Sequence, residues 1–270
     1  MLTRFAPSPT GELHLGHAYS AALAHAAARG AGGAFRIRID DIDGSRSRED
    51  YVAASLADLE WLGLDRDGEP VRQSAHLDDY AEALETLRAR GLVYPCFCTR
   101  ADIAQSLAAP HGPSGAVYPG TCRPLSEAER ERRMGDEPHC WRLDMARATA
   151  FAGELQWEEQ GQGRRAADPA AHGDVVLARK DAPASYHLAS TVDDAAMGVT
   201  HVIRGADLIA STDVHRLLQA LLGLPTPLYR HHALVCGPDG KRLAKRDAAA
   251  SLASLRAGVR PCGPAARAGS

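Results

Sequence analysis

The chain has 270 residues, with 31 basic and 34 acidic side chains, a formal net charge of −3, 45% hydrophobic residues and 24% charged residues. This balance excludes a coiled coil, a collagen-like fibre and a disordered chain, because it provides ample apolar surface for a core without strong charge repulsion. The length suits one large domain or two modest ones.

Two features of the chain bear on its location. The first ten residues contain no apolar stretch of the signal-peptide type, and the alanine-rich run at 18–28 is too short and too weakly hydrophobic to span a bilayer. The six cysteines are few and unevenly spaced, which argues against a secreted disulfide framework. We therefore expect a soluble, cytoplasmic protein with no membrane partner.

The N-terminal part alternates strands and helices. An apolar strand at 2–6 is followed by a Pro-Ser-Pro-Thr-Gly turn, a helix at 13–29 and a strand at 34–39 in which apolar and basic residues alternate. Two further helices are predicted at 48–62 and 77–90. This order predicts a parallel sheet with crossover helices.

The middle of the chain has a different character. It holds a cysteine cluster, a Pro/Gly-rich stretch and a short charged helix, which predict an α+β insert. The alternating pattern resumes with strands at 174–178, 200–203 and 229–236 around a helix at 212–222. We predict an α/β fold in which a doubly wound parallel sheet is interrupted by an insert. The predicted segments are the first half of the sheet domain at 1–93, the insert at 94–172, the second half at 173–250 and a short, flexible tail at 251–270.

The most specific motif follows the first strand, where residues 4–17 read RFAPSPTGELHLGH. The turn opens onto a helix whose unpaired N–H groups and dipole attract phosphate. His14 and His17 are three residues apart and project from one face, and Gly16 leaves room for an adenine or a ribose. A histidine pair at this spacing is more often an ordinary surface or core feature, but its position after a strand and a turn favours a nucleotide site.

This segment closely resembles the His-x-Gly-His signature of the class I aminoacyl-tRNA synthetases, and the longer string resembles their glutamyl branch. A second signature of that family, a Lys-Met-Ser-Lys-Ser-type loop, is matched by residues 242–246, with Arg242 in place of the first lysine and Ala244 in place of the serine. The resemblance implies a Rossmann-like catalytic domain that binds ATP with Mg²⁺. It implies that the catalytic and ATP-binding residues are His14, Gly16, His17 and Lys245.

The same resemblance implies a glutamate site. Asp40 stands where the glutamyl branch has a glutamate that holds the substrate ammonium, and it is one methylene shorter. Arg204 is the residue expected to pair with the γ-carboxylate, because a guanidinium offers a bidentate fork; a strand-end salt bridge is the alternative. The full implied set is Arg4, Phe5, Ala6, Pro7, Ser8, Asp40, Tyr186 and Arg204.

Three cysteines and a tyrosine in the predicted insert have the spacing of a metal site. Three thiolates and one further donor satisfy tetrahedral zinc, although buried cysteines without a metal are an alternative. The pattern resembles the structural zinc site of the glutamyl-queuosine tRNA(Asp) synthetases, truncated paralogues of glutamyl-tRNA synthetase. The implied ligands are Cys96, Cys98, Tyr118 and Cys122, with His111, His139 and Cys140 as alternative fourth donors.

Chain length distinguishes glutamyl-tRNA synthetase from its truncated paralogues. A full glutamyl-tRNA synthetase continues into a helical anticodon-binding region, and we expect none here. The resemblance to the truncated paralogues implies a zinc-containing insert, and a monomer that uses ATP, L-glutamate and tRNA(Asp) carrying queuosine. It implies that glutamate is activated without tRNA and then joined to queuosine. The alternatives are a small-molecule nucleotidyltransferase, a non-catalytic RNA-binding or regulatory protein, and a discriminating or truncated glutamyl-tRNA synthetase.

Overall fold

The computed structural model describes residues 1–99, 102, 117–235 and 251–258. Its main sheet is built from two groups of strands. One group is parallel, in the order β1 (Leu2–Phe5), β2 (Ala34–Ile39) and β3 (Val71–Arg72). In the other group β9 (His201–Gly205), β10 (Leu228–His232) and β6 (Gln156–Glu159) are parallel, and β7 (Gly163–Ala166) closes the edge antiparallel to β6.

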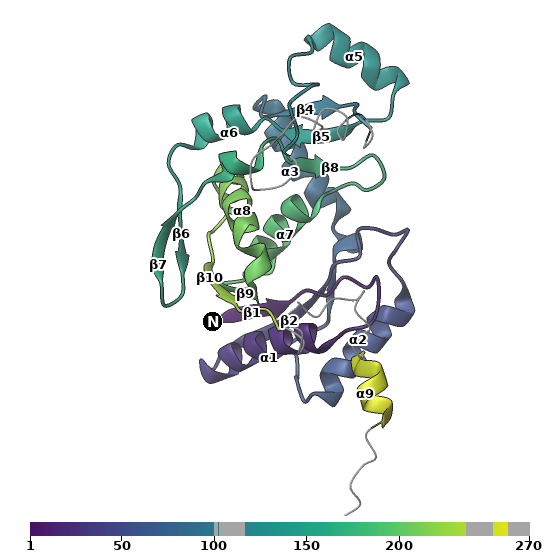
Figure 1. Ribbon diagram of the computed structural model, residues 1–270, viewed down its shortest axis with the longest axis vertical. Coiled ribbons are helices and arrows are strands. Elements are labelled where there is room, and N and C mark those ends of the chain that lie inside the picture. The colour runs from purple at the N-terminus through teal and green to yellow at the C-terminus, as the bar shows by residue number, and fades with distance from the viewer. Residues whose placement is uncertain (100–101, 103–116, 236–250, 259–270) are drawn as a thin grey trace, which may run out of the picture.

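The two groups meet where β9 lies beside β1 (Figure 1). The backbone N–H of Thr200, just before β9, donates to the carbonyl of Leu2 at 3.0 Å. This contact brings the first and last thirds of the chain together. An α/β fold with a parallel sheet is thereby confirmed.

The sheet is flanked by helices that pack through small or apolar faces. In α1 (Leu15–Gly30) the buried residues are four alanines, which allow the helix to lie close to buried side chains of β2 such as Phe35 and Ile37. In Figure 1, α1 and α2 lie below the strands while α7 and α8 lie above them. The helices flanking this sheet are α1, α2 (Glu49–Trp61), α7 (Tyr186–Ala196) and α8 (Ile209–Leu222). Helix α3 (Leu77–Ala89) packs against α7, α8 and β4, and α9 (Leu252–Gly258) packs against α2.

A separate antiparallel sheet carries Cys96 and Cys140. It consists of β4 (Val93–Cys96), β5 (Cys140–Leu143) and β8 (Val176–Ala178), in that order, with α5 (Glu127–Asp136) and α6 (Met145–Ala152) beside it. The prediction that the parallel pattern resumes at 174–178 is wrong, because β8 pairs antiparallel with β5. Conversely β6, from within 94–172, joins the parallel sheet. Segments of three or four residues, such as Val-Leu-Ala in β8 and Gln-Trp-Glu-Glu in β6, are too short to specify which sheet they will join.

Helix length and polarity bear on membrane insertion. Within the described part of the chain, no helix combines the length and the apolar character that a bilayer crossing requires.

Candidate active site

A cavity of about 240 Å³ opens where the carboxyl ends of β1, β2 and β9 approach the start of α1. In open α/β sheets, this edge is the usual place for ligands.

Pro7 and Ser8 do not line the cavity but hold the backbone of Asp40 in place. The backbone N–H of Asp40 donates to the Pro7 carbonyl at 3.0 Å, and the Asp40 carbonyl accepts from Ser8 Oγ at 3.1 Å. Lys245, Arg242 and Ala244 lie outside the described residues. The predicted residues that line the cavity are Arg4, Phe5, Ala6, His14, Gly16, His17, Asp40, Tyr186 and Arg204.

The two histidines cap the first turn of α1 reciprocally. His14 Nδ1 accepts the backbone N–H of Gly16 at 3.1 Å, and His17 Nδ1 accepts the backbone N–H of His14 at 3.2 Å. Because each Nδ1 acts as an acceptor, the neutral form of each ring carries its proton on Nε2. A Cβ on residue 16 would lie 3.0 Å from His14 Cε1, so glycine lets the ring fold over the helix end without a shift.

Below the histidines lies a buried network that joins the predicted residues Arg4 and Asp40 to three charged side chains that pattern analysis missed, Arg38, Asp193 and Asp194. Arg4 donates to both oxygens of Asp194, at 2.8 and 3.1 Å. Arg38, only 1% exposed, donates to Asp40 at 2.6 Å and to Asp194 at 2.7 Å, and lies 3.5 Å from Asp193. No local signal could have found Asp194, because its partners are 190 and 156 positions away.

The carboxyl groups of this network differ in acidity. Burial raises the pKa of Asp40, although Arg38 opposes the shift. Burial also acts to raise the pKa of Asp194, but Arg4 and Arg38 outweigh it and the net shift is downward. With Arg4, Arg38, Asp40, Asp193 and Asp194 ionised, two positive charges face three negative ones. Burial also raises the pKa of Asp193, which does not line the cavity. When all three carboxyl groups are ionised, the network has one negative charge in excess, which suits a cationic ligand group.

The opposite wall carries a buried arginine whose protein partners are all neutral. Arg204 is 5% exposed. Among the described residues, no carboxylate oxygen lies within 4.0 Å of its guanidinium, so the predicted alternative of a strand-end salt bridge is not seen there. Its hydrogen-bond partners are Tyr186 Oη at 3.2 Å, Thr212 Oγ1 at 2.8 Å, His231 Nε2 at 3.2 Å and His215 Nδ1 at 3.4 Å.

Burial first, and then Arg204, lowers the pKa of His215 well below its usual range, so this ring stays neutral and accepts a hydrogen bond. The arginine charge is thus available to an anionic ligand group.

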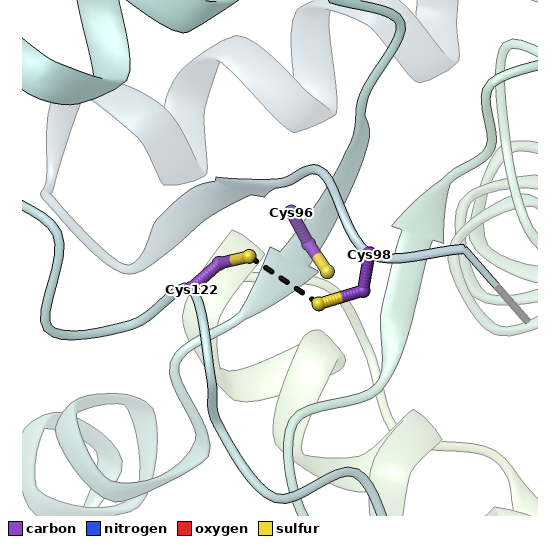
Figure 2. A group of neighbouring side chains, drawn as sticks. All are labelled: Cys96, Cys98 and Cys122. Atoms are coloured by element: carbon purple, nitrogen blue, oxygen red, sulfur yellow. Dashed lines mark hydrogen bonds between the residues drawn. The ribbon is translucent and has the colours of Figure 1, made fainter. Parts of the chain in front are cut away.

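The predicted metal ligands converge in the antiparallel sheet. Cys96 ends β4, Cys98 follows it, and Cys122 comes from the loop before α5; Figure 2 shows their side chains pointing toward one another. The three sulfur atoms all lie within 4.8 Å of one another. Tyr118 Oη lies 3.3 Å from the Cys96 sulfur and 3.5 Å from the Cys98 sulfur, and Cys98 Sγ lies 3.5 Å from Cys122 Sγ.

These distances fit a tetrahedral ion. With the usual zinc bond lengths, two sulfur ligands stand about 3.8 Å apart and a sulfur and an oxygen ligand about 3.5 Å apart. A hydrogen bond from Cys140, despite burial, lowers the pKa of Cys96 to about 4, whereas burial raises the pKa of Cys98 to about 11. Cys96 is thus the cysteine whose thiolate, the form a metal requires, is favoured. Among the described residues the cluster does not include His139 or Cys140, and His111 lies outside them. The three cysteines could therefore hold a metal ion.

Comparisons with known proteins agree with this geometry. Residues 1–257 match the family model for the catalytic domain of class I tRNA synthetases (E and Q). The chain is 49% identical to a glutamyl-Q tRNA(Asp) synthetase of Rhodobacter capsulatus, over 95% of each chain. It is 45% identical to the Symbiobacterium thermophilum protein of the same name, over 94% of this chain and 80% of the other.

A solved structure shares the fold. The glutamate-tRNA synthetase of Elizabethkingia anophelis superposes with a TM-score of 0.79 at 30% identity, over 92% of this chain and 53% of the other, so the chain spans about half of that synthetase. The chain therefore belongs to the class I aminoacyl-tRNA synthetase-like ligases of the E and Q type, and within them to the family of the glutamyl-Q tRNA(Asp) synthetases.

Proposed function

We propose that this protein activates L-glutamate with ATP, without needing tRNA, and transfers it to queuosine in the anticodon of tRNA(Asp), acting as a cytoplasmic monomer. The observation that carries the proposal is the charge pattern of the cavity. Its floor has an excess negative charge at Asp40, and its wall has an uncompensated positive charge at Arg204. A glutamate zwitterion with its ammonium group at Asp40 and its γ-carboxylate at Arg204 would neutralise both.

In the first step, an oxygen of the glutamate α-carboxylate attacks the α-phosphorus of ATP. The bond from that phosphorus to the bridging oxygen breaks, which gives glutamyl-adenylate and pyrophosphate. His14 and His17 sit at the positive end of α1, and the Nε2–H groups of their neutral tautomers stabilise the phosphate oxygens. By resemblance, Lys245 would add charge stabilisation, and Mg²⁺ supplied with ATP would neutralise part of the phosphate charge.

In the second step, a hydroxyl of the queuosine ring attacks the acyl carbon of the adenylate. The new ester bond forms as AMP leaves, and the hydroxyl proton is lost to the leaving phosphate or to solvent. No side chain in the cavity is needed as a nucleophile, so the site works by positioning and charge. The names of the relatives support queuosine-bearing tRNA(Asp) as the acceptor.

We also propose that Cys96, Cys98, Tyr118 and Cys122 hold one structural zinc ion that braces the antiparallel sheet. Such an ion would link the end of β4 to the loop before α5 and would supply folding energy rather than catalysis.

Another relative favours a second candidate function. A glutamate--tRNA ligase 2 of Ruegeria is 42% identical over 96% of this chain and 58% of its own length. A glutamyl-tRNA synthetase would charge tRNA(Glu).

Glutamate-dependent ATP–pyrophosphate exchange in the absence of tRNA tests the first step of the proposed reaction. Exchange is expected with glutamate and not with glutamine, and its absence in intact, zinc-loaded protein would refute the proposal.

A further inference from the structure

Behind Arg204 lies a pair of buried residues that do not line the cavity. The side chains of His231 and Glu159 are 1% and 2% exposed. Glu159 ends β6, and His231 lies on the neighbouring strand β10, where Tyr229 is in register with Glu159. His231 connects Glu159 to the guanidinium of Arg204, which is the residue proposed to recognise the substrate carboxylate.

The hydrogen bonds determine which ring nitrogen of His231 carries the proton. Arg204 Nε can only donate, so His231 Nε2, at 3.2 Å, must accept and is unprotonated. The proton then sits on Nδ1, which donates to Glu159 Oε2 at 2.7 Å. The opposite tautomer would set a lone pair of Nδ1 against a carboxylate at that distance.

Glu159 is itself held in place by the same residue. Its second oxygen, Oε1, accepts the backbone N–H of His231 at 2.7 Å. The two oxygens therefore accept two donors from one residue, and the backbone donor cannot change. Only a carboxylate offers two acceptors in this arrangement, because an amide offers one acceptor and one donor.

The arrangement also keeps the charge of Glu159 away from Arg204. The imidazole ring stands between the two groups, so the guanidinium is oriented by a neutral acceptor and keeps its positive charge for the cavity. We propose that Glu159 and His231 are positioning residues that fix the orientation of Arg204 and thereby set the preference of the site for a side-chain carboxylate over an amide. This inference rests on the proposed glutamate-activating function.

Substitution of Glu159 by glutamine tests the pair. The amide oxygen must face the backbone N–H of His231, so the NH₂ group faces Nδ1 and favours the Nε2–H tautomer. That proton then faces the Nε–H of Arg204 and Thr212 Oγ1, which lies 3.2 Å from Nε2 and can accept it, so Arg204 Nε loses its acceptor. Glu159→Gln should raise the KM for glutamate in ATP–pyrophosphate exchange by about tenfold and lower the preference for glutamate over glutamine, with kcat and the KM for ATP within about twofold of the parent.

The matched control is Glu158→Gln, the exposed neighbour on the same strand. It should leave every constant within about twofold of the parent. A parental KM for glutamate in Glu159→Gln would overturn the inference. Absence of exchange in the parent would instead refute the proposed function.

A measurement that needs no stable variant follows the ring proton directly. The ¹⁵N NMR spectrum of the parent, with the His231 ring assigned by through-bond correlation to its own backbone resonances, should show the Nδ1–H tautomer at neutral pH. An Nε2–H tautomer or a doubly protonated ring at that residue would contradict the inference, whatever the activity of the protein.

Discussion

The rings of His14 and His17 stack with their centroids 3.8 Å apart, and each ring accepts a backbone N–H from the first turn of α1. The helix end therefore fixes both rings before any nucleotide arrives. Such preorganisation avoids reorientation of the donors when charge develops on the phosphate.

The packing around Gly16 gives a first prediction. Gly16→Ala places a methyl group 3.0 Å from His14 Cε1 and 3.1 Å from His14 Nδ1, so the ring must shift by a few tenths of an ångström from its position at the helix end. We expect ATP–pyrophosphate exchange to fall by about tenfold or more. The free energy of unfolding should change by no more than about 1 kcal/mol, because alanine favours the helix. Gly30→Ala, at the other end of α1 where a Cβ meets nothing within 4 Å, is the control and should keep parental activity. Equal exchange rates for the two variants would contradict this role for Gly16.

The buried network gives a second prediction. Asp194→Asn removes the charge that Arg4 and Arg38 share, and should lower the free energy of unfolding by about 3–5 kcal/mol in urea titrations at pH 7. The exposed pair of Asp181 and Arg179 provides the control, since Asp181→Asn should cost no more than about 1 kcal/mol.

The difference in stability between the parent and Asp194→Asn should also depend on pH. The pKa of Asp194 is lowered in the folded protein, so its contribution to stability is present above the pKa of the unfolded chain and is lost as the pH falls through the folded value. The difference in stability between the parent and Asp194→Asn should therefore shrink below a pH of about 4. A difference that stays constant, or that grows on acidification, would contradict the ion-pair account.

The cysteine cluster gives a third prediction, measured as bound metal by elemental analysis and as melting temperature. Cys98→Ser should lose the zinc ion and destabilise the antiparallel sheet. Tyr118→Phe should weaken zinc binding by about tenfold or more if its oxygen is the fourth ligand. Cys140→Ser, which alters a cysteine outside the cluster, should keep the metal. If Tyr118→Phe retained all its zinc and Cys140→Ser lost it, Cys140 rather than Tyr118 would be the fourth zinc ligand.

The second signature gives a fourth prediction, which rests on the sequence alone. Lys245→Ala should reduce the rate of exchange by about 100-fold, because a cation opposite the departing pyrophosphate is lost. Its melting temperature should match that of the parent. Exchange at the parental rate would refute the assignment of residues 242–246 to the loop.

Local patterns predicted much of the fold. The strand expected at 34–39 is β2 to the residue, and the helix expected at 77–90 is α3 within one residue, since alternation and helical periodicity are properties of neighbouring residues. The strand expected at 174–178 was assigned to the wrong sheet, and β6 lies within the segment expected to be the insert, because a strand of three or four residues carries no signature of its partner.

The candidate site, like the fold, could be predicted only in part from local patterns. The residues around the His-x-Gly-His turn could be predicted because they form one continuous string, and the structure brings Tyr186 and Arg204 to the same cavity. Arg38, Asp194 and Glu159 could not, because their roles arise from hydrogen bonds between distant segments. Glu159 is 72 positions from His231.

The central claim is tested most directly by transfer of labelled glutamate to purified tRNA in the presence of ATP. The acceptors are tRNA(Asp) with queuosine, tRNA(Asp) without it, and tRNA(Glu). The proposed function predicts label on queuosine-bearing tRNA(Asp) alone, and charging of tRNA(Glu) would contradict it.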